Sequence, residues 1–508
     1  MFENQPKGLW ALALANTGER FGYYTMLAVF ALFLQANFGF ATGTASTIYS
    51  TFLMLVYFLP VIGGIAADRW GFGRMVTTGI VIMFVGYLLL AFPLGSGTPA
   101  ILAMAAALLL VSLGTGLFKG NLQVMVGRLY DEARYANRRD AGFSLFYMAI
   151  NIGAMFAPTA AIAIMNWAQT DLGISEADSY HFAFGVACAS LIVSIAIYYA
   201  FQGWFSHVLV GEGKKGEKAE VADTLTPAET RERIVCLCLV FAVVIFFWMA
   251  FHQNGLTLTF FARDYTQTSS AGVQSMMFDV TNLVACIFIV YALFSGFQAK
   301  SNKTRILSAS VFAAACFYLG WQYQQSNEAV AVFAPIFQQF NPCFVVMLTP
   351  VSVGVFSWLA KKNLEPSSPK KIGLGMLVAA CGFFIMIGAS IGLLLPDAQT
   401  AAIEAGGDVT RVSANWLVST YLVLTFAELL LSPIGISFVS KVAPPKYAGL
   451  MMGLWFASTA IGNFLVQIPG LLWGANVELV YIWAVLAGIC LLSALFIFAI
   501  LKKLERVA

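Results

Sequence analysis

Long apolar segments recur along the whole chain and restrict the kinds of fold that it can adopt. We count about fourteen, over residues 9–37, 43–66, 75–94, 99–127, 140–168, 181–205, 232–262, 271–298, 305–323, 329–360, 371–395, 412–440, 447–473 and 478–501. Each is close to or above the about 20 residues with which an α-helix crosses a bilayer. Only 10% of the 508 residues are charged, against about 25% in soluble domains. The pattern predicts an all-α polytopic membrane protein with about fourteen transmembrane helices.

The distribution of positive charge predicts the orientation of these helices. If both termini are cytoplasmic, Arg20 and Lys119 lie inside the membrane and only Arg263 and Arg411 face outward, which leaves 24 of the 28 Lys and Arg residues in the cytoplasm. Lys and Arg favour cytoplasmic loops. No cleavable signal peptide is expected, because the first apolar segment has the length of a full span and lacks a small-residue cleavage site. We therefore expect a multi-pass protein of the cell (inner/plasma) membrane.

The strongest break in composition, over residues 206–230, is polar, charged and poor in aromatic residues. We interpret it as a cytoplasmic linker between an N-terminal six-helix bundle (1–205) and a C-terminal bundle (231–508). Because six-plus-six arrangements are common among secondary transporters, two of the eight later spans are surplus. We assign them to an inserted helix pair at about 271–323, a peripheral hairpin in which Asp279 and Asn282 leave room for a further role.

Four of the charged residues within the apolar spans stand out: Glu19, Arg20, Lys119 and Glu428. A charge at the centre of a membrane costs about 2.5–3.5 kcal/mol even on mild insertion scales. Such residues are seldom kept there without a use. They predict a shared polar cavity in a protein that moves something polar across the bilayer.

One face of the first span carries a polar stripe at helical spacing. Its members are Asn16, Glu19, Arg20, Tyr23 and Tyr24. We expect the Glu19 and Arg20 side chains to diverge and engage other partners; the alternative is a structural ion pair that holds helices together. The planar guanidinium of Arg20 and the compact ammonium of Lys119 both suit a carboxylate.

Glu428 is followed one turn later by Ser432, and as a buried carboxylate it needs a cation. Lys119 and a substrate ammonium are the two candidates. Asn151 and Asn341 are amides within further spans, and Pro342 frees backbone groups as broken helices do at transport sites. Either amide could instead be interhelical glue.

Two tryptophans, Trp248 and Trp455, lie in the middle of their spans instead of at the membrane surface. They either pack in the core or line a pocket for apolar side chains. The sequence contains no nucleophile–base set, no metal-ligand spacing and no nucleotide loop, so we expect neither an enzyme nor a metal site. The eight cysteines lie in apolar spans without paired spacing, as small core residues do.

Several strings also resemble a known family. GERFGYY (18–24) and FYMAINIGA (146–154) are similar to the ExxERFxYY and FYxxINxGS signatures of the proton-dependent oligopeptide transporters, a family of the major facilitator superfamily. GGIAADRWGFGR (63–74) is similar to the first cytoplasmic-loop motif of that superfamily. Further strings, GTGLFKGNLQVMVGRLY, FNPCFVVMLTP, NLEPSSPKKIGLG, AELLLSPIGISFVSKVAP and MMGLWFASTAIGN, match in kind and order.

The resemblance implies a role for each polar group. Arg20 and Lys119 would hold the carboxylate of a peptide, and Asn151, Asn341 and Glu428 its ammonium. The remaining substrate contacts would be Tyr23, Tyr24, Tyr57, Trp248, Ser432 and Trp455. Lys119 and Glu428 would form a salt bridge that breaks and re-forms during alternating access. Asp68, Arg69 and Arg74 would belong to a cytoplasmic gate.

The chain departs from this pattern at two positions. Asn16 stands where the family has a proton-coupling glutamate, and it cannot titrate. In FFWMAFHQNG (246–255), His252 stands where the family often has an acid. An imidazole, with an unperturbed pKa near 6.5, suits a proton relay, although a lone histidine in a helix is more often structural.

We therefore predict a monomeric secondary active importer of di- and tripeptides, in which protons are the coupling ion and no cofactor is used. Proton coupling would involve Glu19, Glu428 or His252. Two alternatives remain: a carrier of another small anion or peptide-like metabolite, and a membrane sensor that binds peptides but barely moves them. No nucleic acid is expected as a partner.

Overall fold

The computed structural model describes residues 5–135, 139–209, 225–299, 301–326, 328–407 and 409–507. Fourteen helical segments within these residues are long and apolar enough to cross a membrane. This confirms the predicted all-α membrane protein and its number of spans.

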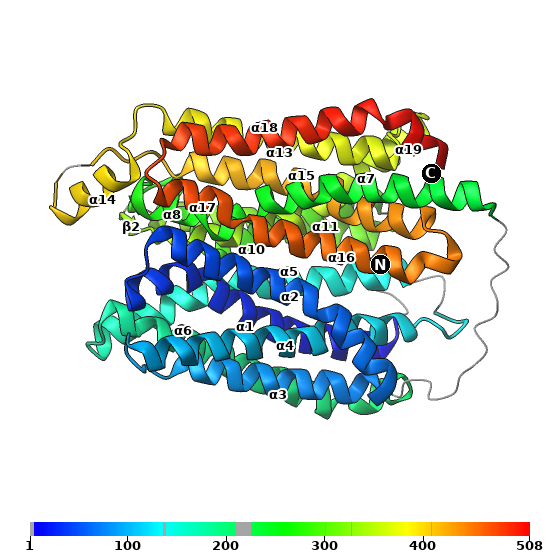
Figure 1. Cartoon of the computed structure of the whole chain (residues 1–508), viewed down its shortest axis with the longest axis horizontal. Helices are drawn as coiled ribbons and strands as arrows, with labels where there is room; N and C mark the ends of the chain where they lie inside the picture. The colour runs from blue at the N-terminus through cyan, green and yellow to red at the C-terminus, as the bar shows by residue number, and fades with distance from the viewer. Residues whose placement is uncertain are drawn as a thin grey trace.

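The first six spans are single helices that pack as one bundle. They are α1 (Lys7–Phe38), α2 (Thr42–Trp70), α3 (Phe72–Ala91), α4 (Thr98–Arg128), α5 (Arg139–Asp171) and α6 (Glu176–Ala200). Two short 3-10 turns, η2 (Gln202–Trp204) and η3 (Ser206–Val208), follow. These helices form the lower layer in Figure 1.

The second bundle contains several broken spans. Its members are α7 (Pro227–Phe251) with η4 (His252–Gly255) and α8 (Thr257–Asp264), η5 (Ala334–Gln339) with α12 (Phe340–Lys361), α13 (Ser368–Ser390), α15 (Asn415–Val442), α16 (Ala448–Leu465) with α17 (Gln467–Gly474), α18 (Leu479–Ala499) and α19 (Leu501–Val507). The connecting elements are β1 (Ser269–Ser270), α9 (Val273–Met276), β2 (Val330–Ala331), α14 (Pro396–Glu404) and η6 (Pro445–Tyr447). The start of α1 and the end of α19 lie at one end of the molecule, which we call the terminal end, and α14 lies at the opposite end (Figure 1).

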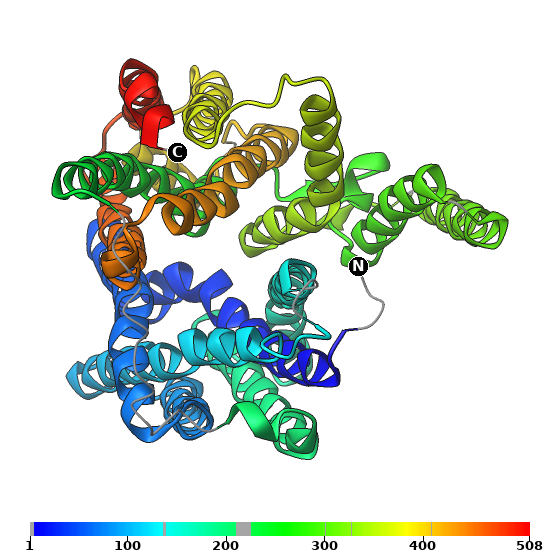
Figure 2. The same ribbon diagram turned by 90° about the vertical axis from the view of Figure 1, so that its right-hand side faces the viewer.

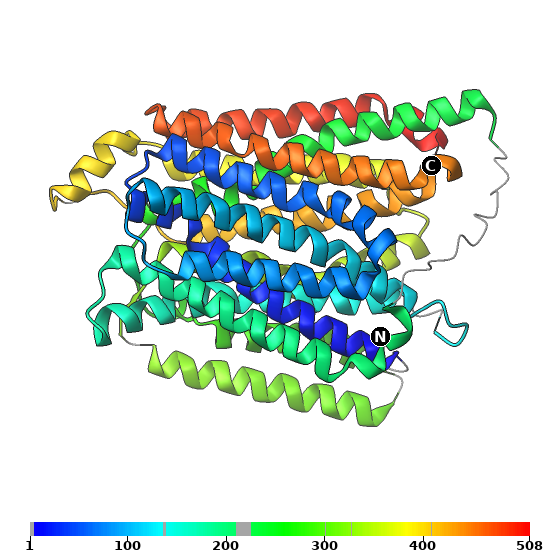
Figure 3. The ribbon, with the colours of Figure 1, turned by 60° about the horizontal axis from the view of Figure 1, so that its bottom comes forward.

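The surplus pair is α10 (Val280–Gln298) and α11 (Asn302–Gln325). Seen along the helices, it lies at the side of the two bundles (Figure 2), and α11 runs along one edge (Figure 3). Helix α10 begins nine residues later than residue 271, where we expected it. Asp279 caps it by accepting a hydrogen bond from the Thr281 amide, and Ser269–Ser270 pairs with Val330–Ala331 instead of joining a helix.

The proposed linker at 206–230 falls mostly outside the described residues, since residues 210–224 are not among them. At its end, Thr226 begins α7 with a capping box: its hydroxyl accepts from the Glu229 amide, and the Glu229 carboxylate accepts from the Thr226 amide. This reciprocal pair fixes where α7 starts.

Glycines allow the helices of the first bundle to approach closely. A Cβ on Gly63 of α2 would collide with the Gly116 carbonyl oxygen of α4, whereas a Cβ on the neighbouring Gly64 would meet nothing within 4 Å. Overpacking a close contact typically costs about 1–3 kcal/mol. The α2–α4 contact therefore depends on Gly63.

We expect Gly63→Ala to destabilise the protein by about 1–3 kcal/mol relative to Gly64→Ala. Both substitutions make the same gain in helix propensity, so the difference isolates the clash. Thermal unfolding of the two detergent-purified variants measures it. Equal melting temperatures would show that α2 and α4 separate at no cost.

Candidate functional site

A cavity of about 290 Å³ lies between the two bundles. Its wall comes from α1, α2, α4 and α5 on one side and from α7, α12, α15 and α16 on the other. Every residue predicted to contact substrate is on this wall: Arg20, Tyr23, Tyr24, Tyr57, Lys119, Asn151, Trp248, Asn341, Glu428, Ser432 and Trp455. Asn16 and His252 join them. Spans that are far apart in the sequence thus bring their polar residues to one place.

Arg20 and Glu19 form a bidentate ion pair on α1. The guanidinium donates from Nε to Glu19 Oε2 and from Nη2 to Glu19 Oε1, both at 2.5 Å. Both side chains are almost completely buried, and Glu19 lies behind Arg20, away from the cavity wall. The expectation that the two would diverge is wrong, because in this apolar surrounding each is the nearest counter-charge for the other.

Glu428 is held by neutral groups. Asn341 Nδ2 donates to Glu428 Oε2 at 2.9 Å, and the Tyr147 hydroxyl donates to Oε1 at 3.3 Å. Asn341 also donates to Thr425 Oγ1 at 3.1 Å, which ties α12 to α15. Asn151 donates to the Tyr147 carbonyl within its own helix. Among the described residues no cation forms a salt bridge with Glu428.

Lys119 lies over the ring of Tyr57, with Nζ 4.2 Å from the ring centroid. No salt bridge joins it to Glu428 within the part of the chain described. The expected Lys119–Glu428 pair is therefore absent from this conformation. Tyr57 stabilises the ammonium through a cation–π contact, and Glu428 is already hydrogen-bonded.

His252 occupies the point where α7 breaks into η4. Its ring stacks on Trp248 with centroids 5.1 Å apart, and the Tyr57 ring lies 5.9 Å away. Its Nδ1 is buried without a hydrogen-bond partner in the described residues. The histidine thus faces the cavity between two aromatic rings and near Lys119.

The predicted gate residues lie elsewhere. Arg69 and Arg74 are exposed, near the junction of α2 and α3, and neither lines the cavity. The side chain of Asp68 is outside the described part of the chain. Their gating role stays a prediction.

Sequence reasoning missed several wall residues, of which Tyr147 is the most important because it binds Glu428. A signal for it was present: Tyr147 lies one helical turn before Asn151, so both side chains share a face of α5. The others are Leu27, Tyr49, Leu53, Gln123, Phe146, Ile150, Ala154, Pro158, Phe251, Asn254, Gln338, Ile436, Phe456 and Thr459. Most of these are apolar or uncharged residues that resemble ordinary core.

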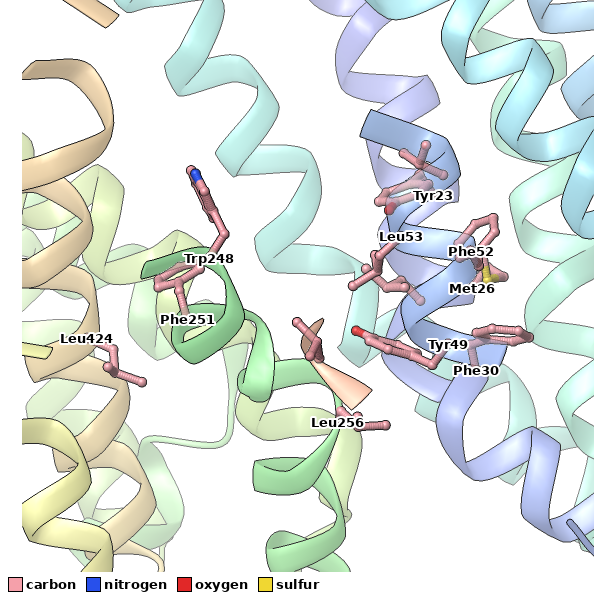
Figure 4. Packing of buried hydrophobic residues seen from close by; sticks show 14 of the residues in the cluster. Tyr23, Met26, Phe30, Tyr49, Phe52, Leu53, Trp248, Phe251, Leu256 and Leu424 are labelled. Atoms are coloured by element: carbon pink, nitrogen blue, oxygen red, sulfur yellow. The ribbon is translucent and has the colours of Figure 1, made fainter. Parts of the chain in front are cut away.

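The two bundles meet at the end opposite the termini. Arg263 Nη1 donates to Gln35 Oε1 at 2.6 Å, and Gln338 Nε2 donates to the Ala28 carbonyl at 3.0 Å. Figure 4 shows Tyr49 of α2 facing Leu256 across the boundary between the bundles. These contacts cover the cavity at this end.

Toward the terminal end the cavity continues. A second hollow of about 810 Å³ shares Tyr57, Lys119 and two further wall residues with the first. It reaches Arg128 and Arg139, where α4 ends and α5 begins. The structure is therefore open toward the terminal end.

Comparison with known proteins agrees with this architecture. The model of the POT family matches residues 74–219 and 324–471, more than half of the chain. The chain belongs to the POT family. This confirms the resemblance seen in its motifs.

Relatives of this POT family member carry transporter names. It is 28% identical to the peptide transporter YePEPT of Yersinia enterocolitica, over 92% of this chain and 88% of the relative. It is 27% identical to the di-/tripeptide transporter of Lactococcus lactis subsp. lactis, over 90% and 87%. The alignments run almost end to end.

Solved structures confirm the fold. A peptide transporter POT in complex with sulfate superposes with a TM-score of 0.73 and 23% identity, over 100% of this chain and 96% of that one. A POT family transporter in complex with 5-aminolevulinic acid gives 0.74 and 20%, over 99% and 98%. The arrangement is the major facilitator fold with an additional helix pair.

Proposed function

We propose that this protein is a secondary active importer of di- and tripeptides that is driven by protons and works by alternating access. The observation that carries the proposal is the separation of charge on the cavity wall. Arg20 and Lys119 lie on α1 and α4 of one bundle, and Glu428 lies on α15 of the other. A short zwitterionic peptide can span these two sites, with its carboxylate at the cations and its ammonium at Glu428. The names of the relatives support the same substrate class.

Proton coupling follows from the Glu19–Arg20 pair in this proposal. Protonation of Glu19 removes the counter-charge of Arg20 and frees its guanidinium fork for the peptide carboxylate. Asn16 cannot take part because an amide does not titrate. His252 and Glu428 are further proton carriers on the wall, and either would alter the contacts between the bundles when its charge changes.

The orientation completes the proposal. Both termini lie in the cytoplasm of a cell whose inner membrane holds the protein, so the observed opening faces inward and is the state that releases peptide. Arg69 and Arg74, with Asp68, would close this end when the cavity opens outward. The protein works as a monomer and needs no cofactor besides the coupling proton.

Uptake of labelled dialanine into proteoliposomes, with and without an inward proton gradient, tests the proposal. We expect the gradient to raise initial uptake several-fold, because each inward step carries protons down their gradient. Uptake that ignores the gradient would contradict proton coupling. Saturable binding without uptake would identify a sensor, and neither binding nor uptake would indicate a carrier of another metabolite.

A further inference from the structure

The charges on the cavity wall are unevenly balanced. Among the described wall residues, the ionisable side chains other than tyrosines are Arg20, Lys119, His252 and Glu428. Glu19 neutralises Arg20 from behind the wall. If the proposed function is right, protonation of Glu19 frees Arg20 for the peptide carboxylate and Glu428 binds the ammonium, which leaves the charge of Lys119 unbalanced. Within the described part of the chain, this wall holds no further carboxylate for a positively charged peptide side chain.

The part of the wall around His252 holds ring nitrogens that lack hydrogen-bond partners among the described residues. Trp248 stacks on His252, and neither Trp248 Nε1 nor His252 Nδ1 has a partner in the described residues. Asn463 of α16 lies beside the imidazole. It is completely buried and is not part of the cavity wall. Buried polar groups are nearly always hydrogen-bonded, so unpaired atoms at one site indicate a missing ligand or water.

The groups that face His252 determine whether the ligand at this place should carry a negative or a positive charge. Its ring contacts are Tyr57, Trp248 and Phe251, and the ammonium of Lys119 acts on it electrostatically. No carboxylate is among these neighbours. An indole N–H is a donor, and an imidazole donates from one nitrogen when neutral and from both when protonated. Donors beside a lysine suit an anion and repel a cation.

We propose that this transporter prefers peptides with an acidic side chain over peptides with a basic one, and that His252 and Trp248, next to Lys119, form the subsite for the acidic group. The substrate class is thereby narrowed from dipeptides in general to neutral and acidic ones. The preference rests on the proposed function, because it presumes that a peptide occupies the cavity.

Competition against counterflow of labelled dialanine, without a proton gradient, tests the preference. The competitors are Ala-Glu, its near-isostere Ala-Gln, and Ala-Lys. We expect the half-inhibitory concentration of Ala-Lys to exceed that of Ala-Glu by at least about 10-fold, which corresponds to a difference of about 1.4 kcal/mol in binding free energy. The value for Ala-Gln should lie between the two. Equal values, or a lower value for Ala-Lys, would overturn the preference alone. An absence of dialanine counterflow would overturn the proposed function and the preference with it.

Variants locate the subsite. In His252→Gln we expect Ala-Glu to lose its advantage over Ala-Gln, and in His252→Glu we expect Ala-Lys to compete better than Ala-Glu. The control is His207→Gln, the same change at an exposed histidine outside the cavity, which should keep the wild-type order. Because each ratio is taken within one variant, a lower overall rate does not disturb it. If Ala-Glu still competes better than Ala-Gln in His252→Gln, the subsite lies elsewhere. The ratio of the Ala-Lys and Ala-Glu half-inhibitory concentrations in the wild type decides the preference even if a variant fails to fold.

Discussion

Replacing Arg20 with alanine is expected to reduce dialanine uptake by about 100-fold or more. The substitution removes the guanidinium that would bind the peptide carboxylate. It also leaves the Glu19 carboxylate, which is 0% exposed, without its counter-charge. A fork of two hydrogen bonds to a charged group contributes about 1.5–3 kcal/mol for each bond, and each 1.4 kcal/mol is about a factor of ten in affinity. Breaking the buried ion pair costs a further about 3–5 kcal/mol of folding stability. Uptake and dialanine binding, measured on the same preparation, give the size of the loss.

A loss of uptake in Arg20→Ala has two sources, misfolding and loss of the substrate contact, and a double variant separates them. In Glu19→Gln/Arg20→Gln both charges are gone, so no unpaired charge remains buried. We expect its thermal stability to return toward that of the wild type while dialanine binding stays lost. Arg305→Ala, which removes an exposed arginine of α11, is the control for charge alone. Normal transport by the double variant would refute the role of Arg20 as a carboxylate clamp.

Much of the fold and most of the cavity wall could be predicted from the sequence because the lipid environment restricts which structures and which buried charges are possible. An apolar segment of bilayer length has few alternatives to a transmembrane helix. A charge within such a segment must face a polar interior, which is why Arg20, Lys119 and Glu428 meet on one wall. Their positions follow from the free-energy cost of placing a charge in lipid, which is large and depends only on the immediate surroundings of each residue.

The partners of these charges could not be predicted in the same way. Which groups a long side chain contacts depends on its rotamer and on the conformational state of the two bundles. Glu19 and Arg20 turn toward each other, and Lys119 lies over Tyr57 instead of reaching Glu428. In the outward-open state of an alternating-access cycle the same residues can pair differently, so spacing along the chain does not determine their contacts.

The start of α10 shows a second limit. Residues 271–279 precede α10 and contain the separate short helix α9; a local hydrogen bond at Asp279 and the pairing of two short strands accompany this break in the span. Both interactions are small compared with the burial of a span. Hydropathy averages over a window and cannot resolve them.

Glu428→Gln is expected to weaken dialanine binding by on the order of 10- to 100-fold. A hydrogen bond to a charged group contributes about 1.5–3 kcal/mol, and the substitution removes the negative charge while keeping the shape of the side chain. Asn341 and Tyr147 hold the carboxylate from the protein side, so a glutamine fits the same place. Competition binding against labelled dialanine measures the loss.

Acetylating the peptide shows whether Glu428 binds the ammonium. In the wild type, N-acetyl-dialanine should compete on the order of 10- to 100-fold worse than dialanine, because it has no ammonium for Glu428. In Glu428→Gln the two ligands should differ by less than about 3-fold, since the interaction that acetylation removes is already gone, as in a double-mutant cycle. Glu404→Gln, at an exposed glutamate of α14, should leave the full acetylation penalty in place. A full penalty in Glu428→Gln as well would mean that another group binds the ammonium, and the carboxylate that Asn341 and Tyr147 hold would then serve proton transfer alone.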